Sequence, residues 1–365
     1  MNRKLPPLTC FFILCTCILS SQQPDSLSGP EGKIFGLFTN DEPIEITLKF
    51  DMATYFRKKP KEDYLKAGMI FHTGKNDSIS HEIKLRTRGE FRNRECTFAP
   101  IELNLKKVDF GYSDLDSIGK IKLVTQCNYG SDNSDNLLEE YLVYKLFNAL
   151  TDTSFRVRLI RLTFVDTGKE PDERNEGKEK RVRKPITQWA FLIEPNEILA
   201  KRLNAVQLKT NSVTQKNIYP VVMDRLAMFN YMVGNYDWSI PGQHNVKIFK
   251  PLAPAMSPYV VAIPYDFDWT GVVNPPYALP AEETGLNSVR ERLFTGICRP
   301  VPVFMKQLDL LASKKDEFFE IINNFEYLKK KQKSEITTYL DTFYAEMSGN
   351  RSRIISILTN SCKKL

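Results

Sequence analysis

The residues best suited to chemistry are carboxylates and amides in the second half of the chain. Asp237 follows an apolar stretch, and Asn245 lies eight positions further on. Asp266 and Asp268 come directly after the apolar run 260–263. A loop carboxylate can accept the proton of an attacking hydroxyl group, and carboxylate and amide oxygens are the ligands that Mg²⁺ prefers. The order of these residues has the parts of a phosphotransfer centre. Taken by spacing alone, hydrogen bonds that cap loops and turns would explain them as well.

Composition supports a site of this kind and excludes others. The chain of 365 residues has only three histidines, His72, His81 and His244, and they are scattered. A histidine-rich metal site and a Ser-His-Asp hydrolase therefore have little material. The formal charge of +7 comes from 51 basic and 44 acidic residues spread along the chain. In the charged segment 168–184 the two signs nearly cancel, so we expect no nucleic-acid partner.

The first residues have the pattern of an export signal. Arg3 and Lys4 precede an apolar run at 8–19, and Ser20 and Ser21 are small enough for a cleavage site. We expect a signal peptide at 1–21, a linker at 22–39, and an exported protein that is periplasmic, associated with the outer membrane, or extracellular. Cleavage would lower the formal charge to +5. Cys15 or Cys17 could carry a lipid, which is the only membrane attachment that we expect.

Four cysteines follow the predicted signal: Cys96, Cys127, Cys298 and Cys362. Since no two are spaced as CxxC, a zinc ribbon is excluded. Either all four are buried free thiols or, in an exported protein, one disulfide forms. If it does, Cys96 with Cys127 is the pair that we expect.

Two kinds of hydrophobic pattern divide the mature chain. Apolar and polar residues alternate from 44 to 50, which predicts a half-buried strand. Shorter runs predict further strands at 69–71, 83–87, 101–105, 120–125, 157–165, 188–193, 246–249 and 259–263. Helical spacing predicts helices at 136–150, 221–233, 302–326 and 334–358.

These elements predict an α+β chain made of two lobes. Residues 40–195 would form a sheet-rich N-terminal lobe that begins with a small antiparallel sheet at 40–106. Residues 196–365 would form a helix-rich C-terminal lobe. Nothing in the pattern indicates oligomerisation, so we expect a monomer.

Several motifs together resemble the CotH family of atypical kinases. Gly234-Asn235-Tyr236-Asp237 with Asn245 is similar to the family's G-N-x-D…N segment. Pro264-Tyr-Asp-Phe-Asp268-Trp-Thr-Gly271 is similar to its W-D-[LY]-D-W-x-x-G segment, and the HipA-type kinases share a related arrangement. Arg88-Gly89 and the strand 189–194 are similar to two upstream segments. The resemblance extends patchily over about residues 80–300 and implies a two-lobed atypical protein-kinase-like fold that uses ATP with Mg²⁺ or Mn²⁺.

The resemblance also implies roles for individual residues. Asp237 would be the catalytic base, Asn245 and Asp266 the metal ligands, and Asp268 an assisting or orienting carboxylate. Glu194 would lie near the adenine. The nucleotide phosphates would meet Arg88 or Lys122, and this cation would be oriented by Glu139 or Glu140.

One part of the family pattern is missing. The basic pair that the family has after its Arg-Gly segment falls near 97–100, where this chain has no lysine. The nearest basic residues are Arg92, Arg94 and Lys106.

Three functions remain open at this stage. The first is a kinase that phosphorylates a hydroxyl group of an envelope protein. The second is a kinase-like binding module without catalytic activity. The third is a hydrolase that uses Asp237 with Asp266, which would need two carboxylates at a suitable separation.

Overall fold

The computed structural model describes residues 33–74, 77–168 and 183–364. The predicted signal peptide, Cys15, Cys17 and most of the charged segment 168–184 lie outside the described residues. The strands are β1 (Ile44–Phe50), β2 (Leu65–His72), β3 (Ser78–Thr87), β4 (Ile101–Asn104), β5 (Lys120–Thr125), β6 (Val157–Asp166), β7 (Ile186–Ile193), β8 (Ala205–Leu208), β9 (Val246–Pro251) and β10 (Val261–Pro264). The α-helices are α1 (Met52–Lys58), α2 (Phe91–Glu95), α3 (Ser113–Asp116), α4 (Ser131–Leu150), α5 (Asn196–Arg202), α6 (Pro220–Val233), α7 (Val301–Ser313), α8 (Lys315–Asn324), α9 (Lys330–Gly349) and α10 (Arg351–Ser361).

The first seven strands form a closed barrel in the order β1-β2-β3-β4-β5-β7-β6. Neighbouring strands are antiparallel except at the closure, where β1 runs parallel to β6 from Ile44 opposite Ile160 to Phe50 opposite Asp166. The chain is a mixed α+β protein, as predicted. A closed barrel takes the place of the small antiparallel sheet that we expected for the first lobe of a typical two-lobed kinase.

Alternation explains the barrel core. In β1 the residues Ile44, Ile46, Leu48 and Phe50 are buried, whereas Glu45 and Lys49 are exposed. The other barrel strands contribute inward residues in the same way, and together they form one hydrophobic cluster. A barrel of this size is filled by its own side chains and is not a channel.

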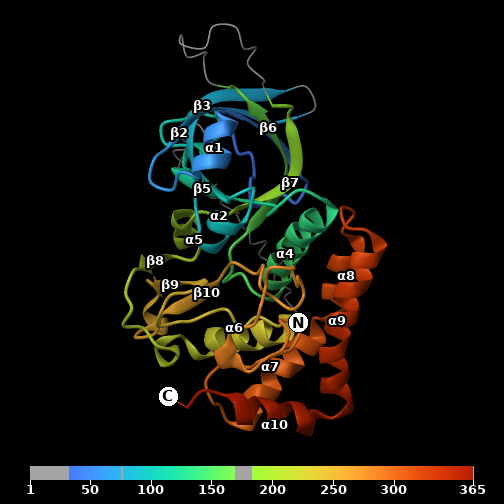
Figure 1. The fold of residues 1–365 in the computed structure, drawn as a ribbon. Helices are drawn as coiled ribbons and strands as arrows, with labels where there is room; N and C mark the ends of the chain where they lie inside the picture. The colour runs from blue at the N-terminus through green and yellow to red at the C-terminus, as the bar shows by residue number, and fades with distance from the viewer. Residues whose placement is uncertain (1–32, 75–76, 169–182, 365) are drawn as a thin grey trace, which may run out of the picture.

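The second half has its own core. β8, β9 and β10 form a three-stranded sheet in the order β10-β9-β8, and α6 contacts β10. Figure 1 shows this sheet and α6 below the barrel, with α7 and α10 at the far end of the molecule. The long helix α4 belongs to this second core and also contacts β6 and β7, so it joins the barrel to the C-terminal half.

Three predicted helices differ from the observed ones. α4 begins at Ser131, five residues before the predicted start, because its first turn is polar and resembles a loop. The helix predicted at 302–326 is two helices, α7 and α8, which are separated at Lys314. The helix predicted at 334–358 is also divided, because Asn350 leaves the helical conformation and its side chain accepts a hydrogen bond from Arg353 N at the start of α10.

Two disulfides join the four described cysteines. Cys96 is bonded to Cys127, which confirms the expected pair. Cys298 is bonded to Cys362, a second bond that we did not predict. No helix in the described part of the chain is both long enough and apolar enough to cross a bilayer.

Candidate functional site

Two glycines bring the predicted acidic segments together. Gly234 ends α6 in the left-handed conformation, with φ 70°, which favours glycine. Its carbonyl oxygen accepts a hydrogen bond from Gly271 N at 3.1 Å. A Cβ atom at Gly234 would lie 2.1 Å from the Tyr339 hydroxyl, and one at Gly271 would lie 2.3 Å from the same oxygen. The loop after α6 and the loop after β10 therefore meet where only glycine fits.

Asp237 lies in the loop after α6 and is held by two neighbours. The Asn245 amide nitrogen donates to the main-chain oxygen of Asp237 and to Asp237 Oδ2, each at 2.9 Å. His244 Nε2 lies 2.8 Å from Asp237 Oδ1, and this hydrogen bond raises the pKa of His244. Asn235 Oδ1 accepts from Asp237 N at 3.1 Å. The carboxylate is therefore fixed in position while remaining partly exposed.

The two carboxylates after β10 have different surroundings. Asp266 is only partly buried, and within the described residues its carboxylate makes no hydrogen bond or ion pair, although its main-chain N–H donates to the Tyr144 hydroxyl at 2.7 Å. Asp268 is buried and accepts from the Tyr277 hydroxyl at 3.0 Å. Burial, together with the charge of Asp266, raises the pKa of Asp268 to about 7.

Two of the predicted metal ligands have an uncommon backbone conformation. Asn245 and Asp266 both have positive φ, 51° and 66°. Asn and Asp tolerate the left-handed region better than other residues, but the conformation is still uncommon and is concentrated at functional sites. Five other described non-glycine residues also have positive φ, so this conformation fixes the placement of the two side chains without by itself indicating a function.

The barrel supplies a buried cation that faces these acids. Arg92, on the short helix α2, donates to the Thr125 main-chain oxygen and to Glu140 Oε2 of α4, the latter at 3.4 Å. Arg92 Nε and Glu140 Oε1 are buried and have no hydrogen-bond partner. The charges of Tyr277, Glu140 and Asp268 raise the pKa of Arg92 despite its burial. The pair links α2 and β5 of the barrel to α4.

Two lysines lie beside the same acids. Lys122 Nζ is 4.5 Å and Lys247 Nζ is 4.9 Å from the ring centroid of Tyr265. Burial lowers the pKa of Lys122 to about 7, and the positive charges of Arg88 and Lys247 act in the same direction. Lys122 thus has little to neutralise its charge, and a bound anion would stabilise the charged form.

The predicted residues converge on one cavity of about 410 Å³ between the barrel and the C-terminal half. From the C-terminal half, Asp237, Asn245, Asp266 and Asp268 line it. From the barrel, Arg88 at the end of β3 lines it together with Arg92, Val124 and Ile193. The C-terminal half thus contributes most of the carboxylates, and the barrel side contributes both arginines together with Glu90.

Four predicted residues are not among the lining residues: Lys122, Glu139, Glu140 and Glu194. Lys122 is next to the cavity through Tyr265. Glu140 lies behind it and reaches it through Arg92. The Glu194 side chain is turned away: it pairs with Arg202 at 2.8 Å and accepts from Arg156 N at 3.1 Å.

Sequence reasoning missed four contributors to the site. These are the pairing of Arg92 with Glu140, the Tyr277 hydroxyl, Lys247, and an aromatic wall. Phe91 and Trp269 form that wall, with ring centroids 5.3 Å apart. Arg92 had a weak signal, since it was among the basic residues nearest to the gap in the family pattern. Tyr277 had none, because only the folded loop places its hydroxyl on Asp268.

The donor atoms fit a hard cation of the kinase type. In the described ranges no three His, Cys, Asp or Glu side chains are grouped as a complete metal site. A kinase-type metal site does not need three such side chains. The protein supplies one amide and one or two carboxylates, and a phosphate and water supply the remaining ligands. Asp266 has an unengaged carboxylate, and Asn245 uses its amide nitrogen on Asp237, which leaves its oxygen available.

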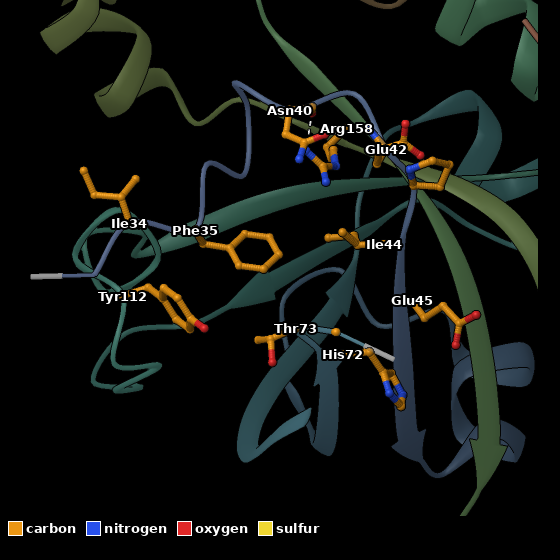
Figure 2. A pocket seen from close by; sticks show the side chains of 12 residues that line it. Ile34, Phe35, Asn40, Glu42, Ile44, Glu45, His72, Thr73, Tyr112 and Arg158 are labelled. Atoms are coloured by element: carbon orange, nitrogen blue, oxygen red, sulfur yellow. Dashed lines mark hydrogen bonds between the residues drawn. The ribbon is translucent and has the colours of Figure 1, made fainter. Parts of the chain in front are cut away.

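A larger hollow of about 630 Å³ lies on the barrel, away from these residues (Figure 2). Its buried cation, Arg158, donates to the main-chain oxygens of Gly36, Leu37 and Asn40. Arg158 therefore fastens the segment that leads into β1. Nothing at this hollow resembles the acid and base arrangement of the other cavity, so volume alone does not identify the site.

Comparison with known proteins gives a distant likeness among solved structures. No family model and no curated protein sequence matches the chain. Among solved structures, the crystal structure of a Helicobacter pylori proinflammatory kinase, CtkA, is similar with a TM-score of 0.37 and 12% identity. The alignment covers 76% of this chain and 94% of that one. A likeness at this level does not establish a family, and the function proposed below depends on the side chains of the cavity.

Proposed function

We propose that the protein is an atypical, CotH-like kinase that transfers a phosphoryl group from ATP to a hydroxyl group of a protein. The observation that carries this proposal is the convergence of Asp237, Asn245 and Asp266 on one cavity that Arg88 and Arg92 also line. Phosphoryl transfer asks mainly for positioning and charge neutralisation, which such a cavity supplies. It needs no catalytic histidine.

The residues would divide the work as follows. Asp237, fixed by Asn245 and His244, would accept the proton of the attacking hydroxyl. Asn245 and Asp266 would hold Mg²⁺ or Mn²⁺, which neutralises charge on the nucleotide phosphates when bound, and Asp268 would assist. Arg88 and Lys122 would contact the phosphates.

The roles predicted for Glu140 and Glu194 must be revised. Glu140 would orient Arg92 and not Arg88 or Lys122, because Arg92 is its partner. Glu194 would be near the adenine only through its main chain, since its carboxylate is engaged with Arg202. Its neighbour Ile193 lines the cavity and would pack against the base.

Binding and catalysis can be tested separately by thermal unfolding and by phosphoryl transfer. ATP with Mg²⁺ or Mn²⁺ should raise the Tm, and the metal-dependent part of the shift should disappear in Asp266→Asn. Asp237→Asn should retain the shift but lower transfer from γ-labelled ATP to itself or to casein by roughly 10²–10⁴-fold. Asp309→Asn, on the exposed face of α7, is the matched control and should behave as wild type.

Each outcome separates the remaining functions. A metal-dependent shift without transfer would favour the non-catalytic binding module. Turnover of a glycoside or ester without nucleotide would favour a hydrolase. No shift with any nucleotide would refute the kinase proposal.

We further propose that the protein is exported and that its substrate is an envelope protein. The two disulfides support export, because disulfides persist mainly in oxidising compartments. Mass spectrometry of the protein from envelope fractions should give an N-terminus near residue 22, or a lipidated Cys15 or Cys17. An intact Met1 in the cytoplasmic fraction would contradict the proposal.

A further inference from the structure

A second hollow, on the outer surface of the barrel, is lined mainly by lysines. It measures about 620 Å³ and crosses β1, β2, β3 and the end of β4. Its basic residues are Lys49, Lys66, Lys84, Lys106 and Lys107. All five are exposed: Lys49, Lys66 and Lys84 because the alternation of β1, β2 and β3 turns their neighbours inward, and Lys106 and Lys107 because they lie in the turn after β4. We call this surface the lysine groove.

The lysines of the groove have no counter-ions. Among the described residues none of the five forms an ion pair, and Glu82 is the only acidic residue that lines the groove. Lys66 on β2 lies directly opposite Lys84 on β3. Like charges in that position destabilise a sheet. Lys84 next faces Asn104 on β4, and the one carboxylate of the described lining, Glu82, lies two residues before Lys84 on the same face of β3.

The floor of the groove is open at a glycine. Gly68 lies in the interior of β2, directly opposite Lys49. A Cβ atom there would make only an ordinary contact, 3.7 Å from Lys49 Cβ, so the fold does not require glycine. Glycine inside a strand weakens it and often marks the close approach of a ligand. Its presence leaves room between its two cross-strand neighbours, Lys49 on β1 and Glu82 on β3.

We propose that the lysine groove binds a compact anion that carries several phosphate groups. Lysines bind phosphate as point charges, and several of them suit a cluster of phosphates. The groove has no arginine for bidentate recognition and no aromatic side chain on which bases could stack, which disfavours a single-stranded nucleic acid. The same chemistry occurs in free polyphosphates and in phosphorylated lipid headgroups.

Titration calorimetry with inorganic tripolyphosphate tests the site. We expect binding that weakens with added salt and that falls at least roughly tenfold in Lys66→Gln/Lys84→Gln. Lys209→Gln/Lys330→Gln removes two exposed lysines elsewhere and should bind as wild type. Arg88→Gln/Lys122→Gln removes the two basic residues proposed to contact the nucleotide phosphates in or beside the kinase-like cavity, and binding to the groove should persist in it. This result is independent of whether the cavity binds ATP.

Gly68→Ile tests the position of the site without changing charge. It should fill the floor and weaken tripolyphosphate binding, while circular dichroism and Tm show an intact fold. Sedimentation with phosphatidylcholine vesicles, with and without a phosphatidylinositol bisphosphate, identifies the source. Retention that requires the bisphosphate and is lost in the groove variants indicates a lipid headgroup, and binding of tripolyphosphate alone indicates a free anion. Unchanged affinity in Lys66→Gln/Lys84→Gln, an equal loss in the Lys209/Lys330 control, or tighter binding to a DNA duplex would each overturn the proposal.

Discussion

At the scale of single residues, Arg92 is the side chain on which the cavity wall depends. It is 9% exposed and contacts Glu140, which is 1% exposed. Removing one member of a buried pair leaves the other charge without compensation, which costs about 3–5 kcal/mol. Removing both together is far less costly, because no isolated charge is left behind. Arg92 thus has a structural role that can be measured without knowledge of the ligand.

A double-mutant cycle measures this role. Arg92→Gln should lower the free energy of unfolding by about 3 kcal/mol, and Arg92→Gln/Glu140→Gln should be more stable than the sum of the single changes predicts. Urea denaturation checks both values. Arg94→Gln on the same helix removes an exposed pair with Glu95 and should change stability by about 0.5 kcal/mol or less. Additive effects at Arg92 and Glu140 would show that the two charges do not interact.

At the scale of elements, the crossing of the loops after α6 and β10 depends on the space that Gly234 leaves. Gly234→Ala has two costs. It places alanine at a φ of 70°, and its Cβ would lie 2.1 Å from the Tyr339 hydroxyl. Gly285→Ala has a similar φ of 66° and no neighbour within 4 Å, so it isolates the cost of conformation. We expect about 1 kcal/mol for Gly285→Ala and distinctly more for Gly234→Ala. Adding Tyr339→Phe to Gly234→Ala should recover part of the lost stability. It removes the hydroxyl that the new Cβ would meet, and among the described residues this buried hydroxyl has no hydrogen-bond partner. Equal losses at the two glycines would contradict the steric explanation.

Helix α4 carries a second, pH-dependent prediction at Glu139. This buried side chain faces Asp135 of its own helix and Glu335 of α9, with Arg290 as the opposing charge. Burial and the two carboxylates raise its pKa from 4.5 to about 8. The folded protein therefore favours the protonated acid. The stability that this preference contributes is complete below about pH 4.5 and is lost as the pH rises through 8.

Glu139→Gln should remove that pH dependence. Relative to wild type, the variant should gain stability progressively between pH 4.5 and 8, by roughly 2 kcal/mol or more, since one pKa unit corresponds to ~1.4 kcal/mol. Denaturation curves at pH 5, 7 and 9 give the comparison. Glu320→Gln, exposed on α8 and not among the charges that act on Glu139, should show little of this trend. A constant difference across the pH range would refute the assignment.

These elements also show what the sequence can predict. Local patterns gave β1, β6, β7, α6 and the acidic residues behind β10, because alternation and helical spacing depend on neighbouring residues. Closure of the barrel depends on β1 pairing with β6, more than a hundred residues away, and no local pattern encodes that register. The candidate residues Asp237, Asn245 and Asp266 lie in local motifs and could be predicted, whereas Tyr277 and the pairing of Arg92 with Glu140 depend on distant segments and could not.

At the scale of the whole molecule, the cavity lies between two cores, and each half has its own disulfide. Cys298–Cys362 encloses a loop with a sequence separation of 64 and fastens the segment after α10 to the chain before α7. Close to this bond, Ile297 and Lys363 form a bridge, and Lys363 N donates to Gly296 O at 2.9 Å. The bond therefore constrains the end of the helical half without contacting the cavity.

Cys298→Ser/Cys362→Ser should consequently lower stability without altering the cavity. Loop closure over this separation predicts a loss of up to about 4 kcal/mol in the free energy of unfolding. Nucleotide and metal should still raise the Tm of the variant by the same amount as in wild type, because binding energy adds to the stability of the folded state independently of the cross-link.

Cys96→Ser/Cys127→Ser is the comparison. Cys127 lies two residues after Thr125, whose main-chain oxygen accepts the hydrogen bond from Arg92. Loss of that disulfide should reduce the nucleotide-induced shift as well as the stability. Equal nucleotide shifts in both variants would mean that the first disulfide does not hold the basic wall in place.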